Sequence, residues 1–179
     1  MSGPAISSSE LMRSEKRAAA GNSVLAAVVI TGLKIVVGFS TGSLGILSEA
    51  AHSGLDLIAS LLTFFSVGVS DKPADADHQY GHGKVENFSA FVETGLLLLT
   101  CAWIVYEAGL RLFFRRIDIE PSIAAFAVML FSMGLDFWRS RVLGRIANKY
   151  DSQALEADAL HFSTDIWSAG VVVLGWCWF

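Results

Sequence analysis

Charged residues are scarce in this sequence. Asp, Glu, Lys and Arg make up 17% of its 179 residues, whereas a soluble domain normally carries about 25% charge. There is no basic stripe and the formal net charge is -4, which argues against a nucleic-acid partner. Apolar residues, at 53% of the chain, form runs long enough to cross a lipid bilayer. The composition therefore predicts one all-α, multi-pass membrane domain.

Cysteines and hydrolase motifs are also sparse. Cys101 and Cys177 lie in apolar segments and have no C-x-x-C partner, so we expect separate buried thiols rather than a disulfide. No His-Glu-x-x-His motif of an intramembrane zinc hydrolase is present. The first ten residues are polar and Ser-rich, which indicates no cleavable signal peptide. We do not expect an enzyme.

Five apolar segments alternate with polar connections. Residues 1–17 are expected to form a polar cytoplasmic tail, and residues 18–179 the transmembrane domain. Lys34 falls near the end of the first segment, where its side chain is expected to extend to the membrane interface. A basic connector is expected over 139–149, and the apolar end at 176–179 indicates a fragment of a longer protein. The predicted spanning helices cover about 18–39, 44–69, 87–112, 119–137 and 152–179.

Basic residues predict the orientation of these segments. Lys and Arg accumulate at the cytoplasmic ends of spanning helices. The ends on the side of the N-terminus hold nine such residues against three on the other side, so the N-terminus is predicted to be cytoplasmic. The inner set is Arg13, Lys16, Arg17, Lys72, Lys84, Arg139, Arg141, Arg145 and Lys149, and the outer set is Arg111, Arg115 and Arg116.

One polar motif occurs twice inside the apolar segments. Residues 49–56 and 158–165 both read acidic-x-x-His-x-x-x-Asp. Residues four apart share a helix face, so each copy directs one imidazole and one carboxylate the same way. A single histidine could be a helix-packing residue, but ionisable groups are costly in lipid, and their repetition favours a functional site. Two His and two Asp form a ligand set suited to tetrahedral Zn²⁺; they are His52, Asp56, His161 and Asp165.

The predicted topology places the two copies at one depth. His52 and His161 both lie roughly 12 to 14 Å from a helix end, near the middle of a ~30 Å hydrocarbon core. The two helices are expected to run antiparallel, which brings the pairs together. Glu49 then lies toward the outer mouth and Asp158 toward the inner mouth, where we expect them to attract cations.

A second group of possible ligands lies in the polar stretch 71–86. Asp75, His78 and His82 follow one another at spacings of three and four residues, which suits a partly open surface metal site. Glycines at 81 and 83 free the backbone there. The alternative is a solvated loop with incidental histidines.

Three stretches resemble the cation diffusion facilitator family. Residues 42–56 are similar to its second helix, 73–86 to its second-to-third connector and 157–168 to its fifth helix. The resemblance implies a helical bundle that exports divalent cations, commonly in exchange for protons, and works as a homodimer. It implies that His52, Asp56, His161 and Asp165 form the transport site, of the zinc-preferring type. Asp75, His78 and His82 would form a second site at the cytoplasmic face, and Lys84 would join a charge cluster near the dimer interface.

Family members generally have six spanning helices and a soluble cytoplasmic domain, and this chain is expected to lack the sixth helix and that domain. We expect Zn²⁺/H⁺ antiport out of the cytoplasm, in the inner membrane of a bacterium, with the bilayer and divalent ions as partners. The alternatives are a non-transporting metal-binding partner subunit or a transporter of Cd²⁺, Co²⁺, Fe²⁺ or Mn²⁺.

Overall fold

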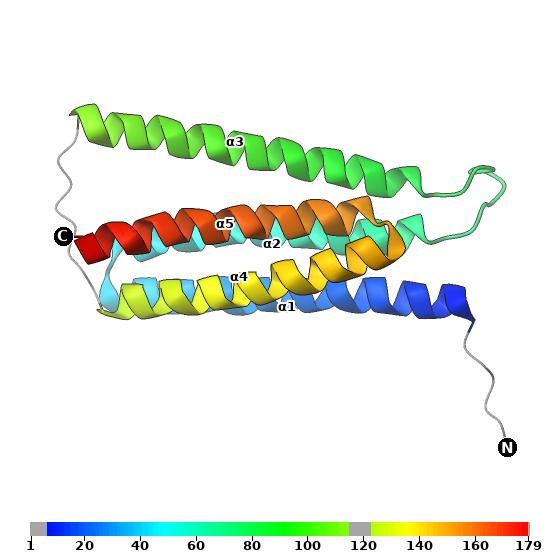
Figure 1. Cartoon of the computed structure of the whole chain (residues 1–179), viewed down its shortest axis with the longest axis horizontal. Helices are drawn as coiled ribbons and strands as arrows, with labels where there is room; N and C mark the ends of the chain where they lie inside the picture. The colour runs from blue at the N-terminus through cyan, green and yellow to red at the C-terminus, as the bar shows by residue number, and fades with distance from the viewer. Residues whose placement is uncertain (1–6, 115–122, 179) are drawn as a thin grey trace, which may run out of the picture.

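The computed structural model of the chain describes residues 7–114 and 123–178. All regular secondary structure in these ranges is α-helical, as predicted (Figure 1). Helices of 26 to 34 residues are about 39 to 51 Å long, which exceeds the ~30 Å hydrocarbon core of a bilayer. The elements are α1 (Ser8–Thr41), α2 (Leu44–Ser70), α3 (Lys84–Phe114), α4 (Ile123–Tyr150) and α5 (Gln153–Trp178).

The five helices form one elongated bundle in which each helix runs opposite to the one before it (Figure 1). α1 packs on α2 and α4, α5 packs on α4, and α3 lies at one edge against α2 and α5. Small side chains let the backbones approach closely, as at Ala19, Ala20, Ala147 and Ala154 in the core cluster. Because the direction of the helices alternates along the chain, α2 and α5 are antiparallel, as expected.

Three helical stretches are long and apolar enough to cross a membrane by length and composition, within the described residues: Ser8–Thr41, Gly45–Ser70 and Lys84–Trp103. α4 and α5 are also long enough to cross a bilayer, at 28 and 26 residues. Large apolar side chains cover much of the outer surface of the bundle, including Phe39 and Leu99. Such a surface is suited to lipid, and a multi-pass membrane fold accounts for it.

α1 begins at Ser8, so most of the predicted polar tail is helical. Ser7 caps the helix: its hydroxyl accepts a hydrogen bond from the backbone N–H of Glu10, and the Glu10 carboxylate accepts one from the Ser7 N–H. This Ser-x-x-Glu capping box is a helix-start signal that outweighs the polarity of residues 8–17. Residues 1–6 lie outside the described part of the chain.

The predicted basic connector at 139–149 is wrong, because α4 continues to Tyr150. One face of this stretch is buried against α1 and α5, with Leu143 and Ala147 in the core, so packing extends the helix beyond its apolar half. The turn to α5 contains Asp151 with a φ of 53°. Arg115, Arg116 and the predicted start of the fourth helix lie outside the described residues, as does the side chain of Cys177. Cys101 is a free, half-buried thiol.

Candidate metal centre

Four predicted ligands meet between α2 and α5. His161 Nε2 lies 3.1 Å from Asp56 Oδ1 and 3.6 Å from Asp165 Oδ2. His52 Nε2 lies 4.0 Å from both Asp56 Oδ1 and Asp165 Oδ1. The i,i+4 spacing on each helix and the antiparallel packing together produce this convergence. The repeated motif therefore corresponds to one compact group of side chains, which we call the His/Asp cluster.

The spacing within the His/Asp cluster suits a small divalent cation. A tetrahedron with ligand bonds of about 2.0–2.1 Å has edges of about 3.3 Å. The histidine nitrogens and aspartate oxygens are 3.1 to 4.0 Å apart, close to that edge length. One donor atom each from His52, Asp56 and Asp165 lie within 4.8 Å of one another. The side chains are 9 to 30% exposed, so the cluster lies inside the bundle and stays reachable.

Lys34 approaches this cluster from α1. The prediction that it extends to the interface is wrong, because its side chain is buried. Its ammonium group donates to Ser53 Oγ at 2.8 Å and to Glu49 Oε2 at 3.2 Å. The Thr31 hydroxyl donates to the backbone carbonyl of Ser53 at 3.0 Å. α1 thus holds the residue next to His52 from two sides, which fixes the height and rotation of α2 at the site.

A buried arginine on α4 contacts α1, α2 and α5. Arg139 is 2% exposed; its guanidinium donates to Ser60 Oγ at 2.7 Å, to Ser23 Oγ at 3.0 Å and to Asp136 Oδ1 at 3.1 Å. The group also lies 3.4 Å from the centre of the Phe162 ring. Sequence reasoning missed this arginine network because it placed Arg139 in a solvated connector.

The two acids flanking the cluster differ in exposure. The Glu49 side chain is 61% exposed beside Lys34, which fits the expected position at a mouth. Asp158 is 1% exposed and accepts a hydrogen bond from Ser23 at 3.2 Å. It therefore does not lie at an open mouth, because α1 and α4 cover it. Another buried acid, Glu93, accepts from the Thr63 hydroxyl at 2.5 Å.

The second predicted group also comes together, in the loop between α2 and α3. Asp75 Oδ1 lies 3.1 Å from His78 Nδ1, and Asp75 Oδ2 lies 3.5 Å from His82 Nε2. The centres of the His78 and His82 rings are 4.4 Å apart. A turn with Gly81 at a φ of 77° lets the chain fold back. We call this group the loop cluster.

Backbone hydrogen bonds organise the loop cluster around one carboxylate. The backbone N–H of His78 donates to Asp75 Oδ1 at 2.7 Å, and that of Asp77 at 3.1 Å. These donors, chiefly the His78 N–H, hold the pKa of Asp75 below its ordinary value. His82 lies just before α3, and its Nδ1 is buried with no hydrogen-bond partner among the described residues. Two imidazoles and an ionised carboxylate suit a borderline cation such as Zn²⁺.

Comparison with known proteins identifies related sequences. A family model described as the cation efflux transmembrane domain matches residues 22–177. An uncharacterized transporter of Synechocystis sp. is 33% identical, over 87% of this chain and 53% of that protein. The cation-efflux pump FieF of Shewanella oneidensis is 26% identical, over 87% and 55%. Metal tolerance protein 2 of Oryza sativa subsp. japonica is 29% identical, over 83% and 44%. The chain thus spans about half the length of the curated relatives it matches.

Proposed function

Because the chain belongs to the cation efflux family, we propose that it provides the membrane-embedded pathway of a divalent-cation transporter, with Zn²⁺ as the main cargo. The observation that carries this proposal is the convergence of His52, Asp56, His161 and Asp165 between two antiparallel helices. The matched family is one of cation efflux, which supports transport rather than enzymatic catalysis.

The ligand types support zinc over harder cations. Two imidazoles and two carboxylates fill a tetrahedron, the geometry that Zn²⁺ prefers, whereas Mg²⁺ and Ca²⁺ take six or more oxygen ligands. Two aspartates balance the two charges of the cation, so a filled site is neutral within the bilayer. Cd²⁺, Co²⁺, Fe²⁺ and Mn²⁺ share parts of this chemistry and are secondary cargo.

Protons are the proposed counter-ion. A histidine must lose its proton, and an aspartate must be ionised, before either can bind a metal. Zn²⁺ entering the His/Asp cluster therefore displaces protons, and protons arriving from the other side displace Zn²⁺. An alternating exposure of the cluster to the two sides then gives zinc/proton exchange.

The placement in the membrane completes the proposal. The excess of Lys and Arg at the ends on the side of the N-terminus supports a cytoplasmic N-terminus, in a bacterial inner membrane. The loop cluster of Asp75, His78 and His82 then faces the cytoplasm, where we propose that it binds a second metal ion. A homodimer is proposed from the family resemblance.

Cobalt spectroscopy tests the proposed site in the purified chain. Co²⁺ in a tetrahedral N/O site gives intense visible absorption, whereas octahedral Co²⁺ does not, and Zn²⁺ should displace it. Every protein in this experiment carries Asp75→Asn, so that the loop cluster does not contribute a cobalt signal. In that background we expect Asp56→Ala and Asp165→Ala to abolish the tetrahedral signal. Glu156→Ala, which removes an exposed acid from the same helix as Asp165, should retain it. A tetrahedral signal that persists in both aspartate variants would refute the site.

A further inference from the structure

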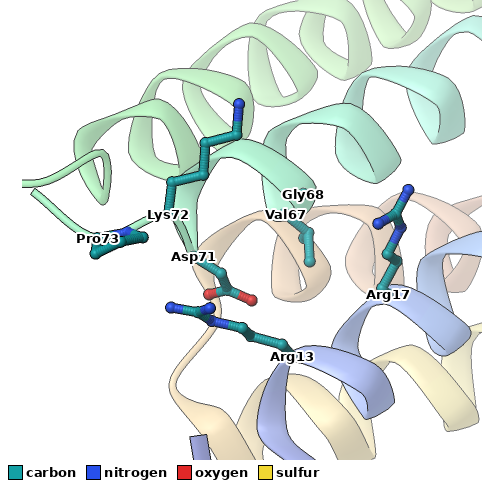
Figure 2. Close-up of a pocket in the computed structure, with 7 residues that line it drawn as sticks. All are labelled: Arg13, Arg17, Val67, Gly68, Asp71, Lys72 and Pro73. Atoms are coloured by element: carbon teal, nitrogen blue, oxygen red, sulfur yellow. The ribbon is translucent and has the colours of Figure 1, made fainter. Parts of the chain in front are cut away.

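A basic pocket opens between the beginning of α1 and the end of α2, and none of its lining residues belongs to either metal cluster (Figure 2). Its volume is about 230 Å³. The polar lining consists of Arg13 and Arg17 from α1 with Asp71 and Lys72 from the end of α2. Gly68 and two apolar residues complete the wall. The transport mechanism proposed above uses none of these side chains.

Basic side chains outnumber carboxylates in the lining of the pocket, three to one. Among the residues that the structure describes, Arg13, Arg17 and Lys72 form no ion pair. Asp71 would repel an anion, but its Oδ1 accepts a hydrogen bond from the buried Lys16 ammonium at 2.9 Å. The pocket therefore keeps a net positive charge.

Three basic side chains from two helices border the pocket. Arg13 and Arg17 are four residues apart and share a face of α1. Figure 2 shows the Arg13 side chain beside Asp71, the Arg17 side chain extending in another direction, and the Lys72 side chain across the pocket from both. Arg17 is oriented by the Phe64 ring, whose centre lies 5.5 Å from the guanidinium carbon. Guanidinium groups bind phosphate oxygens in pairs. The cavity is smaller than the ~300–1,000 Å³ of sites for drug-sized ligands, which favours a phosphate group over a nucleotide.

The position along the bundle indicates where such a phosphate comes from. Exposed apolar side chains such as Leu25 on α1 and Phe65 on α2 cover the adjoining surface. The pocket lies next to this apolar surface, where the same two helices reach their polar ends. Anionic lipid headgroups lie at this level of a membrane, and basic pockets between spanning helices bind them.

We propose that the basic pocket binds a phosphate group, supplied in the membrane by the headgroup of an anionic phospholipid. Arg13 and Arg17 contact the phosphate oxygens and Lys72 adds charge from the end of α2. The bound lipid thereby links the beginning of α1 to the end of α2. The proposal rests on the membrane-spanning fold and not on zinc transport, so the two can fail independently.

Binding to the purified chain in a neutral detergent tests the proposal. Isothermal titration would use dioctanoyl phosphatidylglycerol, dioctanoyl phosphatidylcholine and inorganic phosphate as separate probes. We expect saturable binding of one phosphatidylglycerol and much weaker binding of phosphatidylcholine. Equal binding of the two lipids would overturn the proposal. Inorganic phosphate binding as tightly as phosphatidylglycerol would support the phosphate site and overturn the lipid source.

Charge and volume can be removed separately. Arg13→Gln combined with Arg17→Gln should weaken phosphatidylglycerol binding by about tenfold or more for each arginine. Arg145→Gln, which removes an exposed arginine of α4, should leave it unchanged. Gly68→Leu should block binding without a change of charge, since a Cβ at this position meets no atom within 4 Å and the longer side chain fills the cavity. Tetrahedral Co²⁺ binding in every variant shows that the fold is intact; phosphatidylglycerol affinity equal to wild type in the charge and volume variants would overturn the proposal.

Discussion

Removing the guanidinium of Arg139 should destabilise the bundle severely. This group donates to Ser23, Ser60 and Asp136 and stacks on Phe162, so one side chain joins α4 to α1, α2 and α5. In Arg139→Met the Asp136 carboxylate loses its cation inside the protein. Removal of one partner from a buried ion pair costs about 3 to 5 kcal/mol. For a chain of this size that cost corresponds to a fall in Tm of about 6 to 20 °C.

The assay is thermal unfolding in detergent, followed by intrinsic tryptophan fluorescence. Arg145→Met is the matched control, because Arg145 is exposed on the same helix, and its change should stay within about 0.5 kcal/mol. Arg139→Lys keeps the charge but not the planar group with its several donors, so we expect an intermediate Tm. Arg139→Met combined with Asp136→Asn should recover part of the loss, because the carboxylate is no longer charged. Equal Tm values for Arg139→Met and Arg145→Met would refute the reasoning.

Three further predictions follow from other contacts. Lys34→Met should weaken zinc binding by about tenfold or more, as measured by calorimetry, because the variant loses a group that positions the helix carrying the ligands. Lys34→Arg should bind zinc more tightly than Lys34→Met, and equal zinc affinities of these two variants would contradict the prediction. Gly38→Ala should lower the unfolding free energy by about 1 to 3 kcal/mol, because its Cβ would lie 2.8 Å from the Leu47 side chain. Gly32→Ala is the control, since its Cβ meets nothing within 4 Å and should be tolerated. Equal Tm values for the two variants would contradict the predicted close packing at Gly38. Asp75→Asn should remove one of two bound zinc ions at pH 7. In the wild type the depressed pKa of Asp75 keeps its carboxylate ionised at pH values where an ordinary aspartate is already protonated. On acidification, zinc should therefore leave this site when the histidine ligands take up protons, before Asp75 does. Zinc loss only below about pH 4 would contradict this order of protonation.

The parts of the molecule that sequence reasoning predicted well depend on local spacing. An i,i+4 pair faces one way on any helix, so the pairing of His52 with Asp56 and of His161 with Asp165 needed only two antiparallel helices at one depth. The loop cluster likewise depends on residues close in sequence. The family resemblance, read from three short motifs, is confirmed by the match over residues 22–177. The roles of these residues in binding metal remain predictions.

The features that sequence reasoning missed depend on which helix faces pack together. Arg139 lies in a run that reads as a basic connector, and only the packing of α4 against α1, α2 and α5 buries it. Lys34 stands near a span end, where extension to the interface is common, but its side chain is buried and donates to Ser53 and Glu49 on α2. The early start of α1 is different, because the Ser7–Glu10 capping box was readable in the sequence.

Zinc uptake into proteoliposomes with an imposed pH gradient tests the central claim most directly. The chain would be reconstituted beside its Asp56→Ala and Asp165→Ala variants, with Glu156→Ala as the control and zinc followed by an enclosed fluorescent indicator. We predict uptake that depends on the pH gradient in the wild type and in the control, and none above empty liposomes in either aspartate variant. Uptake that survives both aspartate substitutions, or a wild-type chain that moves no zinc, would contradict the account.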